Sequence, residues 1–365
     1  MNKSIVRFWL FSMMVLTSCT MTKERNDNQV INGYDENVFE TNSPQSSFVD
    51  EIEVIPLRSD SQVVALTNPE KIIYSDSCYY VLDNNMLLRY DAHGNYGGHI
   101  GEQGHGNGEY ISLATFVVRN DTIILIDSFK NSLLAYSLKG NFLYEKKAPD
   151  GVLVNVRDAV YENDVTLFLS NYIYNDQNNI YTRWNIETDE VLTVASIKVC
   201  TDGTKEAVGI HSFCFYGNNI RYVMPFSNII SSTDSDALQL QTTNKVLRDE
   251  ELQKIRDYSI MTYANHSDCF PGFCNIFETK NYIILTFFNL EYTVIDKRNK
   301  ECYRYSYLTD DECAEFPLFN IISSEDNVLL GIANVEENAV LKEKLKNYID
   351  DNENSTDYII RYHVK

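Results

Sequence analysis

The chain has 365 residues and a formal net charge of −21, because 52 aspartate and glutamate residues outnumber 31 lysine and arginine residues. Nucleic acid and anionic lipid repel negative charge, so the composition argues against both as direct partners. With 44% hydrophobic residues, the chain is long enough to bury a large core without relying on disulfides.

The first residues have the pattern of an export signal. Lys3 and Arg7 precede an apolar run over residues 8–16, which is too short to span a bilayer as a helix. The run ends in LTSC, which resembles the lipobox of bacterial lipoproteins, and this resemblance implies cleavage before Cys19 and acylation of that cysteine. The alternative is an ordinary signal peptide with a chance cysteine. We expect a lipoprotein signal peptide over residues 1–18.

Residues 19–45 are polar and have no sustained apolar period, which is typical of a flexible tether. No later apolar run is long enough for a transmembrane helix. We therefore expect residues 46–365 to form the folded part of the chain, held at a bilayer through its N-terminal acyl anchor.

Two stretches near the start of this region repeat. Residues 79–101 read YYVLDNNMLLRYDAHGNYGGHIG, and residues 123–147 read IILIDSFKNSLLAYSLKGNFLYEKK. In each, an apolar strand ends in an aspartate (Asp83 or Asp127), a Leu-Leu-x-Tyr strand follows, and a Gly-Asn turn leads into another strand. A period in the mid-forties with about four strands per unit is typical of a propeller blade.

The first unit ends in the glycine-rich stretch IGEQGHGNGEY, residues 100–110. A phosphate-binding loop would need Gly-Lys-Ser/Thr before a helix, but here Gly108 is followed by Glu109 and a strand. We interpret the stretch as a structural turn between blades, where glycine allows positive φ and close backbone approach. Its glycines are Gly101, Gly104, Gly106 and Gly108.

This turn and the strands after it resemble the NHL-type repeat. They are still more similar to the six-bladed β-propeller lipoproteins of Bacteroides and its relatives, whose crossing usually reads G-x-G-P-G-E-Y. Asn107 stands where that family usually has proline. The resemblance covers roughly residues 48–365. It implies an outer-membrane lipoprotein of a Gram-negative bacterium, on either the periplasmic side or the cell surface.

The later units are more degenerate but keep paired strands. The last unit is one strand short, and residues 48–57 have no partner in the first unit, so we predict that this N-terminal strand closes the last blade. Helical spacing over residues 246–263 and 338–351 predicts two short helical insertions. The predicted fold is therefore an all-β, six-bladed β-propeller. The later units are residues 154–199, 209–243, 272–308, and 316–335 with 357–364.

The sequence contains no G-x-S-x-G or H-E-x-x-H motif and no calcium loop. It therefore assigns no catalytic residue, no metal ligand and no cofactor. Arg157, Asp158 and His211 are candidates for a central funnel, because they lie on or beside predicted innermost strands.

Three functional hypotheses follow. The first is a binding module for a protein partner or a glycan, which the family resemblance suggests. The second is an enzyme, a polysaccharide lyase or hydrolase acting from the funnel. The third is a structural spacer. The absence of a catalytic motif favours binding over catalysis.

Overall fold

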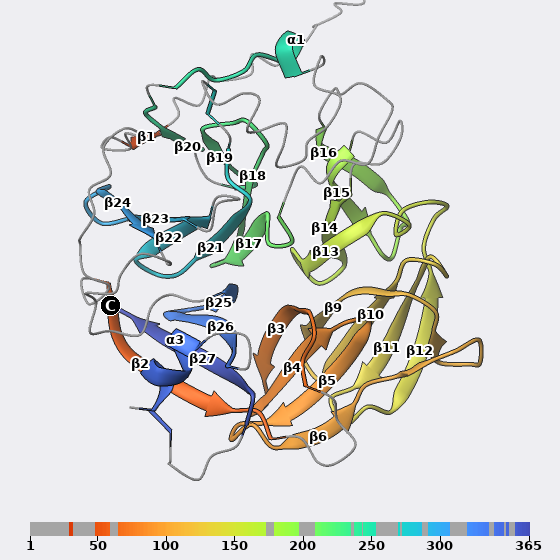
Figure 1. Ribbon diagram of the computed structural model, residues 1–365. Helices are drawn as coiled ribbons and strands as arrows, with labels where there is room; N and C mark the ends of the chain where they lie inside the picture. Colours follow the sequence, from red (N-terminus) through yellow and green to blue (C-terminus); the bar gives the residue numbers. More distant parts are fainter. Residues whose placement is uncertain are drawn as a thin grey trace, which may run out of the picture.

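Six sheets stand around one axis as the blades of a propeller in the part of the chain that the structure describes (Figure 1). This arrangement confirms the predicted all-β, six-bladed fold. The computed structural model describes residues 29–31, 48–58, 65–172, 179–196, 209–234, 237–242, 244–252, 269–270, 272–286, 291–306, 320–335, 339–346, 348–349 and 355–365.

Each blade runs from an innermost strand at the axis to an outermost strand at the rim, and neighbouring strands of this series pair antiparallel. Blades 1 to 3 comprise β3 (Pro69–Ser75), β4 (Cys78–Asp83), β5 (Met86–Asp91) and β6 (Tyr96–His99); β9 (Leu113–Arg119), β10 (Thr122–Asp127), β11 (Ser132–Ser137) and β12 (Phe142–Lys147); β13 (Val156–Tyr161), β14 (Thr166–Asn171), β15 (Asn179–Asn185) and β16 (Val191–Ser196). Blades 4 to 6 comprise β17 (Phe213–Tyr216), β18 (Asn219–Val223), β19 (Ile229–Ser232) and β20 (Leu238–Leu240); β21 (Asn275–Glu278), β22 (Tyr282–Thr286), β23 (Glu291–Asp296) and β24 (Cys302–Ser306); β25 (Ile321–Glu325), β26 (Val328–Asn334), β27 (Asp357–Val364) and β2 (Val49–Pro56).

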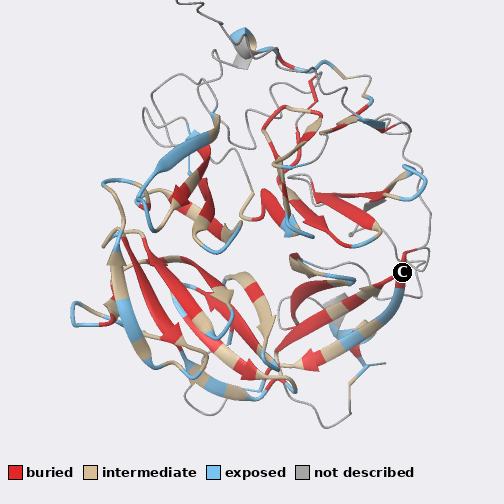
Figure 2. Cartoon of the chain, turned by 180° about the vertical axis from the view of Figure 1, so that it is seen from behind, coloured by how far each residue is buried: buried red, intermediate tan, exposed pale blue. Residues whose placement is uncertain are grey.

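The core lies between the blades. The second strand of a blade is apolar at consecutive positions because both of its faces are covered, and β10 and β22 illustrate this pattern. Figure 2 shows the buried residues concentrated in the strands and the exposed ones mainly at the rim and in turns. One core cluster joins Tyr80 of blade 1 to Ile123 of blade 2, and each blade is therefore stabilised by its neighbours.

The ring closes with the N-terminal strand. β2 pairs antiparallel with β27, from Val49 opposite Val364 to Pro56 opposite Tyr358. The backbone N–H of Lys365 donates to the carbonyl of Phe48, 2.9 Å away. The predicted closure of the last blade by this strand is confirmed, and β2 is its outermost strand.

Blade 4 carries a fifth strand. β1 (Gln29–Ile31) pairs in parallel with β20 on the outer edge of that blade. It lies within the segment predicted as a tether, where the polar composition gave no indication of a strand. The signal peptide and Cys19 lie outside the described residues.

Two helices are described within the segments that we predicted as helical. α1 (Asp249–Leu252) follows β20, and α3 (Ala339–Leu345) lies between β26 and β27. The residues of the first segment after Leu252 lie outside the described residues. Among the helices of the described residues, none is long and apolar enough to cross a membrane.

The two ends of the propeller differ. We call the end with the turns between first and second strands the hairpin face. The opposite end, the crossing face, carries the connections between blades and the turns between second and third strands, including α1 and α3.

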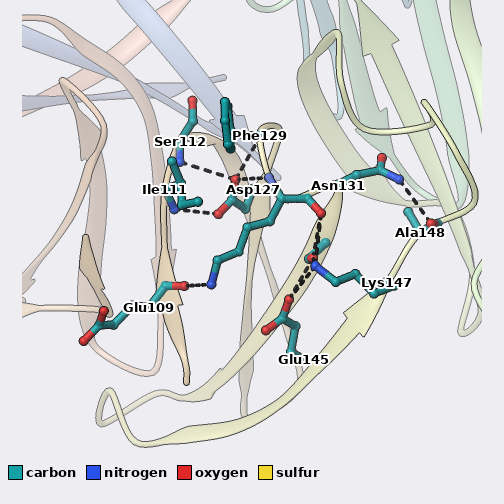
Figure 3. Close-up of polar contacts among 11 residues, drawn as sticks. Glu109, Ile111, Ser112, Asp127, Phe129, Asn131, Glu145, Lys147 and Ala148 are labelled. Carbon is teal, nitrogen blue, oxygen red and sulfur yellow. Dashed lines mark hydrogen bonds and ion pairs between the residues drawn. The ribbon is translucent and has the colours of Figure 1, made fainter. Parts of the chain in front are cut away.

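In blades 1 and 2 the repeated aspartates hold the start of the innermost strand. Asp127 accepts hydrogen bonds from the backbone N–H groups of Ile111, at 2.6 Å, and Phe129, at 2.9 Å (Figure 3). Asp83 occupies the same place in blade 1 and accepts from the N–H of Asn68 at 2.6 Å. Each carboxylate thus ties the crossing to the end of the second strand, which fixes where the innermost strand begins.

Candidate functional site

A cavity of about 460 Å³ lies on the propeller axis. All six innermost strands, or the residues directly beside them, contribute to its lining. The lining includes Asn163 and Asn218 from the turns after the first strands of blades 3 and 4, so the cavity opens toward the hairpin face.

A buried ion pair forms part of the cavity wall. Lys71 of β3 and Asp158 of β13 approach to 2.6 Å, and their side chains are only 12% and 7% exposed. The Lys71 ammonium also donates to the carbonyl of Ala159 at 2.9 Å. Burying two charges is costly unless they are paired and hydrogen-bonded, and this pair meets both conditions.

The same carboxylate oxygen has further donors. Oδ1 of Asp158 accepts a hydrogen bond from the Thr115 hydroxyl at 2.9 Å and from the Ala159 N–H at 2.8 Å. Lys71, Thr115 and Asp158 come from the innermost strands of blades 1, 2 and 3. The network therefore braces three blades around the axis at one level.

His211 also lines the cavity and lies just before β17 of blade 4. Burial lowers the pKa of its imidazole to about 4, opposed by Asp158 and reinforced by the positive charges of Lys71 and Arg157. The ring is therefore neutral at pH 7. Its ring centroid lies 5.5 Å from that of Phe277 on β21.

The rim of the cavity is charged and aromatic. The Arg119 guanidinium pairs with Asp164 and lies over the ring of Tyr161, 4.9 Å from its centroid. On blade 6, Glu325 accepts a hydrogen bond from the N–H of Tyr74 at 2.9 Å, and burial raises the pKa of this carboxyl. The rim thus combines paired charges with an aromatic ring. The lining also includes neutral amide and hydroxyl side chains, those of Asn163, Asn218, Ser323 and Ser324.

Comparison with known proteins identifies the family of the chain. The model of a domain of unknown function, DUF4934, matches residues 30–359, almost the whole chain. The chain belongs to the DUF4934 family. No curated protein matches it.

Solved structures agree on the fold of this DUF4934 protein. A protein described as exported, from Bacteroides fragilis NCTC 9343, is similar with a TM-score of 0.64 and 17% identity, over 92% of this chain and 100% of its own. A member of the DUF4221 family from Bacteroides vulgatus ATCC 8482 is similar with a TM-score of 0.51 and 11% identity, over 87% of this chain and 97% of its own. At these identities the likeness establishes a shared propeller fold of the Bacteroides type.

The structure brings together two of the three funnel residues that the sequence suggested in the DUF4934 chain. Asp158 and His211 both line the cavity, but Arg157 is not among its lining residues. The Arg157 guanidinium lies over the ring of Tyr172, 4.8 Å from its centroid, near the crossing face. Arg157 is the extra residue at a register shift between Val156 and Asp158, and its side chain lies against Tyr172, away from the cavity.

Sequence reasoning missed Lys71, Thr115 and Glu325. A usable signal existed for Lys71, because the innermost strand PEKIIYS carries two charged residues, Glu70 and Lys71, beside an apolar run. A charge on such a strand is either exposed or paired with another charge. Thr115 and Glu325 gave no such signal, because threonine is common in strands and Glu325 stands next to a turn.

The predicted glycine turn lies between β6 and β9 and contains a short parallel pair, β7 (Glu102–Gln103) with β8 (Glu109–Tyr110). Gly108 has φ +76, and a Cβ there would lie 2.7 Å from the ring of Phe142. The N–H of Gly106 donates to the Glu109 carboxylate at 2.6 Å. Glu109 thus occupies the place at which a phosphate loop would hold its anion. The four glycines that the sequence predicts as structural turn residues all lie in this connection: Gly101, Gly104, Gly106 and Gly108.

The cysteines and acids add no further centre among the described residues. No group of three or more histidine, cysteine, aspartate or glutamate side chains there could hold a metal ion. Cys269 and Cys274, the nearest pair in the sequence, are both buried. Burial raises the pKa of the Cys274 thiol well above its usual range, as expected of a small buried side chain.

Proposed function

We propose that this DUF4934 protein is a lipid-anchored envelope binding module that takes one or two sugar units of a glycan into its axial cavity. The observation that carries the proposal is the Lys71–Asp158 pair in the cavity wall. A propeller core does not need a buried ion pair, since apolar residues of similar volume are often at least as stable. A polar wall next to a cavity fits recognition of a hydroxyl-rich ligand.

The size and charge of the cavity support the same ligand class. A volume of about 460 Å³ falls in the range of small-molecule sites. The charges that line it are held within the protein: Lys71 pairs with Asp158, Arg119 with Asp164 and Glu162 with Arg183, and Glu325 accepts a hydrogen bond from the N–H of Tyr74. An ionic ligand would have to compete with these pairs, whereas a neutral sugar can hydrogen-bond to them without separating charge. Phe215 at the cavity is partly exposed and offers a stacking surface.

The envelope location rests on the N-terminal sequence. LTSC at residues 16–19 resembles a lipobox, and the similar B. fragilis protein is described as exported. The glycine crossing also resembles the NHL-like repeats of propeller lipoproteins. We therefore include acylation of Cys19 and attachment to the outer membrane in the proposal.

Catalysis is the second candidate, and one observation favours it. The low pKa of His211 leaves a neutral imidazole in the cavity that could accept a proton, as a polysaccharide lyase or hydrolase requires. Against this, Oδ1 of Asp158 is already occupied by three donors. The two functions separate in one assay, because only an enzyme converts its ligand.

The test is calorimetric binding of neutral oligosaccharides to the soluble form, residues 20–365, which lacks Cys19. We expect binding to one site and its weakening by about tenfold in Phe215→Ala, which removes the stacking ring (~1.4 kcal/mol). Phe129→Ala is the matched control, since Phe129 is an exposed ring in a turn of the crossing face.

Three outcomes contradict the proposal or redirect it. Binding that is lost in Phe129→Ala but kept in Phe215→Ala would place the site on the crossing face. Cleaved or unsaturated sugar products would establish the enzyme. No binding by any neutral glycan, with specific capture of one envelope protein, would replace the glycan by a protein partner.

A further inference from the structure

β1 ties the N-terminal segment to one particular blade. Gln29, Val30 and Ile31 lie opposite Leu238, Gln239 and Leu240 on the outer edge of blade 4. The ladder is extended at both ends, because the N–H of Gln29 donates to the carbonyl of Ala237 and the N–H of Gln241 donates to the carbonyl of Ile31, each at 3.0 Å. Figure 1 shows β1 beside β20, at the rim.

One side chain fixes β1 in place. Ile31 is 2% exposed and belongs to the core cluster that contains Leu240 and Phe270, whereas Val30 is 50% exposed. The strand is therefore held by a buried isoleucine as well as by its ladder, and the two residues offer a matched pair for mutation.

The docked strand reduces the number of residues between Cys19 and the first paired position of the propeller. We call the segment between Cys19 and the first paired strand the leash. About ten residues separate Cys19 from Gln29, so the leash spans at most about 35 Å. Without β1, about 30 residues would separate Cys19 from Val49 and reach about 100 Å. A domain of this size is about 50 Å across, from a radius of gyration of roughly 20 Å.

The comparison of these lengths excludes one orientation of the propeller on the bilayer. Blade 1 lies opposite blade 4 in the ring of six (Figure 1). If blade 1 faced the bilayer, β1 would stand about 50 Å above it, beyond the reach of a ten-residue leash of about 35 Å. The longer leash that exists without β1 would allow every orientation.

We infer that β1 keeps the edge of blade 4 within about 35 Å of the bilayer and excludes the orientation in which blade 1 faces it. The inference rests on the proposed acyl anchor at Cys19. The chemistry of the edge agrees with it. The chain carries a net charge of −21, but in the described strand pair, residues 29–31 and 238–241, every side chain is uncharged, so anionic headgroups do not repel them. Those that are not buried are Gln29, Val30, Gln239 and Gln241.

The test measures the height of two matched positions above a membrane. His93 and Asp234 are exposed and lie in the turns between the third and fourth strands of blades 1 and 4. Each is replaced in turn by a fluorescent amino acid in the full, acylated chain, on phosphatidylethanolamine–phosphatidylglycerol vesicles with an acceptor dye on the headgroups. We expect more energy transfer from position 234 than from position 93.

Two variants remove the constraint by different routes. Ile31→Asp releases β1 by placing a charge in the core, and an insertion of about 30 flexible residues before Gln29 lengthens the leash without touching β1. In both, transfer from the two positions becomes equal. Val30→Asp is the control, because its exposed side chain leaves β1 docked and the difference intact.

The outcomes separate the inference from the anchor. Flotation with vesicles, lost in Cys19→Ser, tests the anchor alone, and a wild-type chain that does not float overturns both the anchor and the inference. A chain that floats but gives equal transfer from both positions overturns only the inference. A difference that persists in the Ile31→Asp and long-leash variants would assign the orientation to another contact and also overturn it.

Discussion

The buried pair of Lys71 and Asp158 offers the sharpest test of the axial site. Lys71→Met removes the ammonium but keeps the aliphatic volume, and it leaves the Asp158 carboxylate, 7% exposed, with only the Thr115 hydroxyl and the Ala159 N–H as donors. Leaving one buried charge without its counter-ion costs about 3–5 kcal/mol. For a domain of roughly 300 ordered residues this lowers Tm by about 5–8 °C.

The assay is a double-variant cycle followed by urea unfolding and by Tm at pH 7. Asp158→Leu alone leaves a buried ammonium and should cost as much as Lys71→Met. The double variant should lie within about 2 kcal/mol of wild type, because no charge is left unpaired and only the partners of the carboxylate lose a bond. Lys139→Met, at an exposed lysine in the turn between β11 and β12, should change stability by less than about 0.5 kcal/mol.

One result would refute the reasoning. If each single variant cost less than about 1 kcal/mol and the two effects added, the pair would behave as a solvated surface ion pair. The wall of the cavity would then be wet and flexible, and it would not be a pre-formed polar site.

Two further predictions concern the turn and the histidine. Gly108→Ala should destabilise the fold by about 1–3 kcal/mol more than Gly151→Ala, because both have similar positive φ but only the Cβ at 108 meets the Phe142 ring; equal losses in urea unfolding would contradict this. His211 has a folded pKa of about 4 against an unfolded value near 6.5, so it stabilises the fold fully above pH 6.5 and loses this contribution as pH falls toward 4. The loss is about 3 kcal/mol, and Tm of His211→Leu should fall less than that of wild type over this interval; parallel curves would show that His211 titrates normally.

Much of the fold could be predicted because the repeat is local. Asp83 and Asp127 mark the same position in two successive units, and the strands around them define the four-stranded pattern of a blade. The strand at residues 48–57, which has no partner in the first unit, indicates how the ring closes. β1 could not be predicted, because three residues give no period and the pairing depends on an edge more than 200 residues away.

The site could be predicted only in part, for a related reason. The local sequence indicates which residues belong to the same blade. Which residues face each other across the axis depends on the register of six strands that are far apart in the sequence. Asp158 and His211 could be placed at the axis because innermost strands could be recognised, while the facing direction of Arg157 and the partnership of Lys71 with Asp158 required the assembled ring.

The measurement that tests the central claim most directly is amide hydrogen exchange on the soluble form, with and without a neutral oligosaccharide that binds it. The account predicts slower exchange confined to the hairpin-face ends of β13, β17 and β25, around the axial cavity, in the wild type and a smaller effect in Phe215→Ala. Protection that instead lay at the rim or on the crossing face, with the cavity strands unchanged, would contradict it.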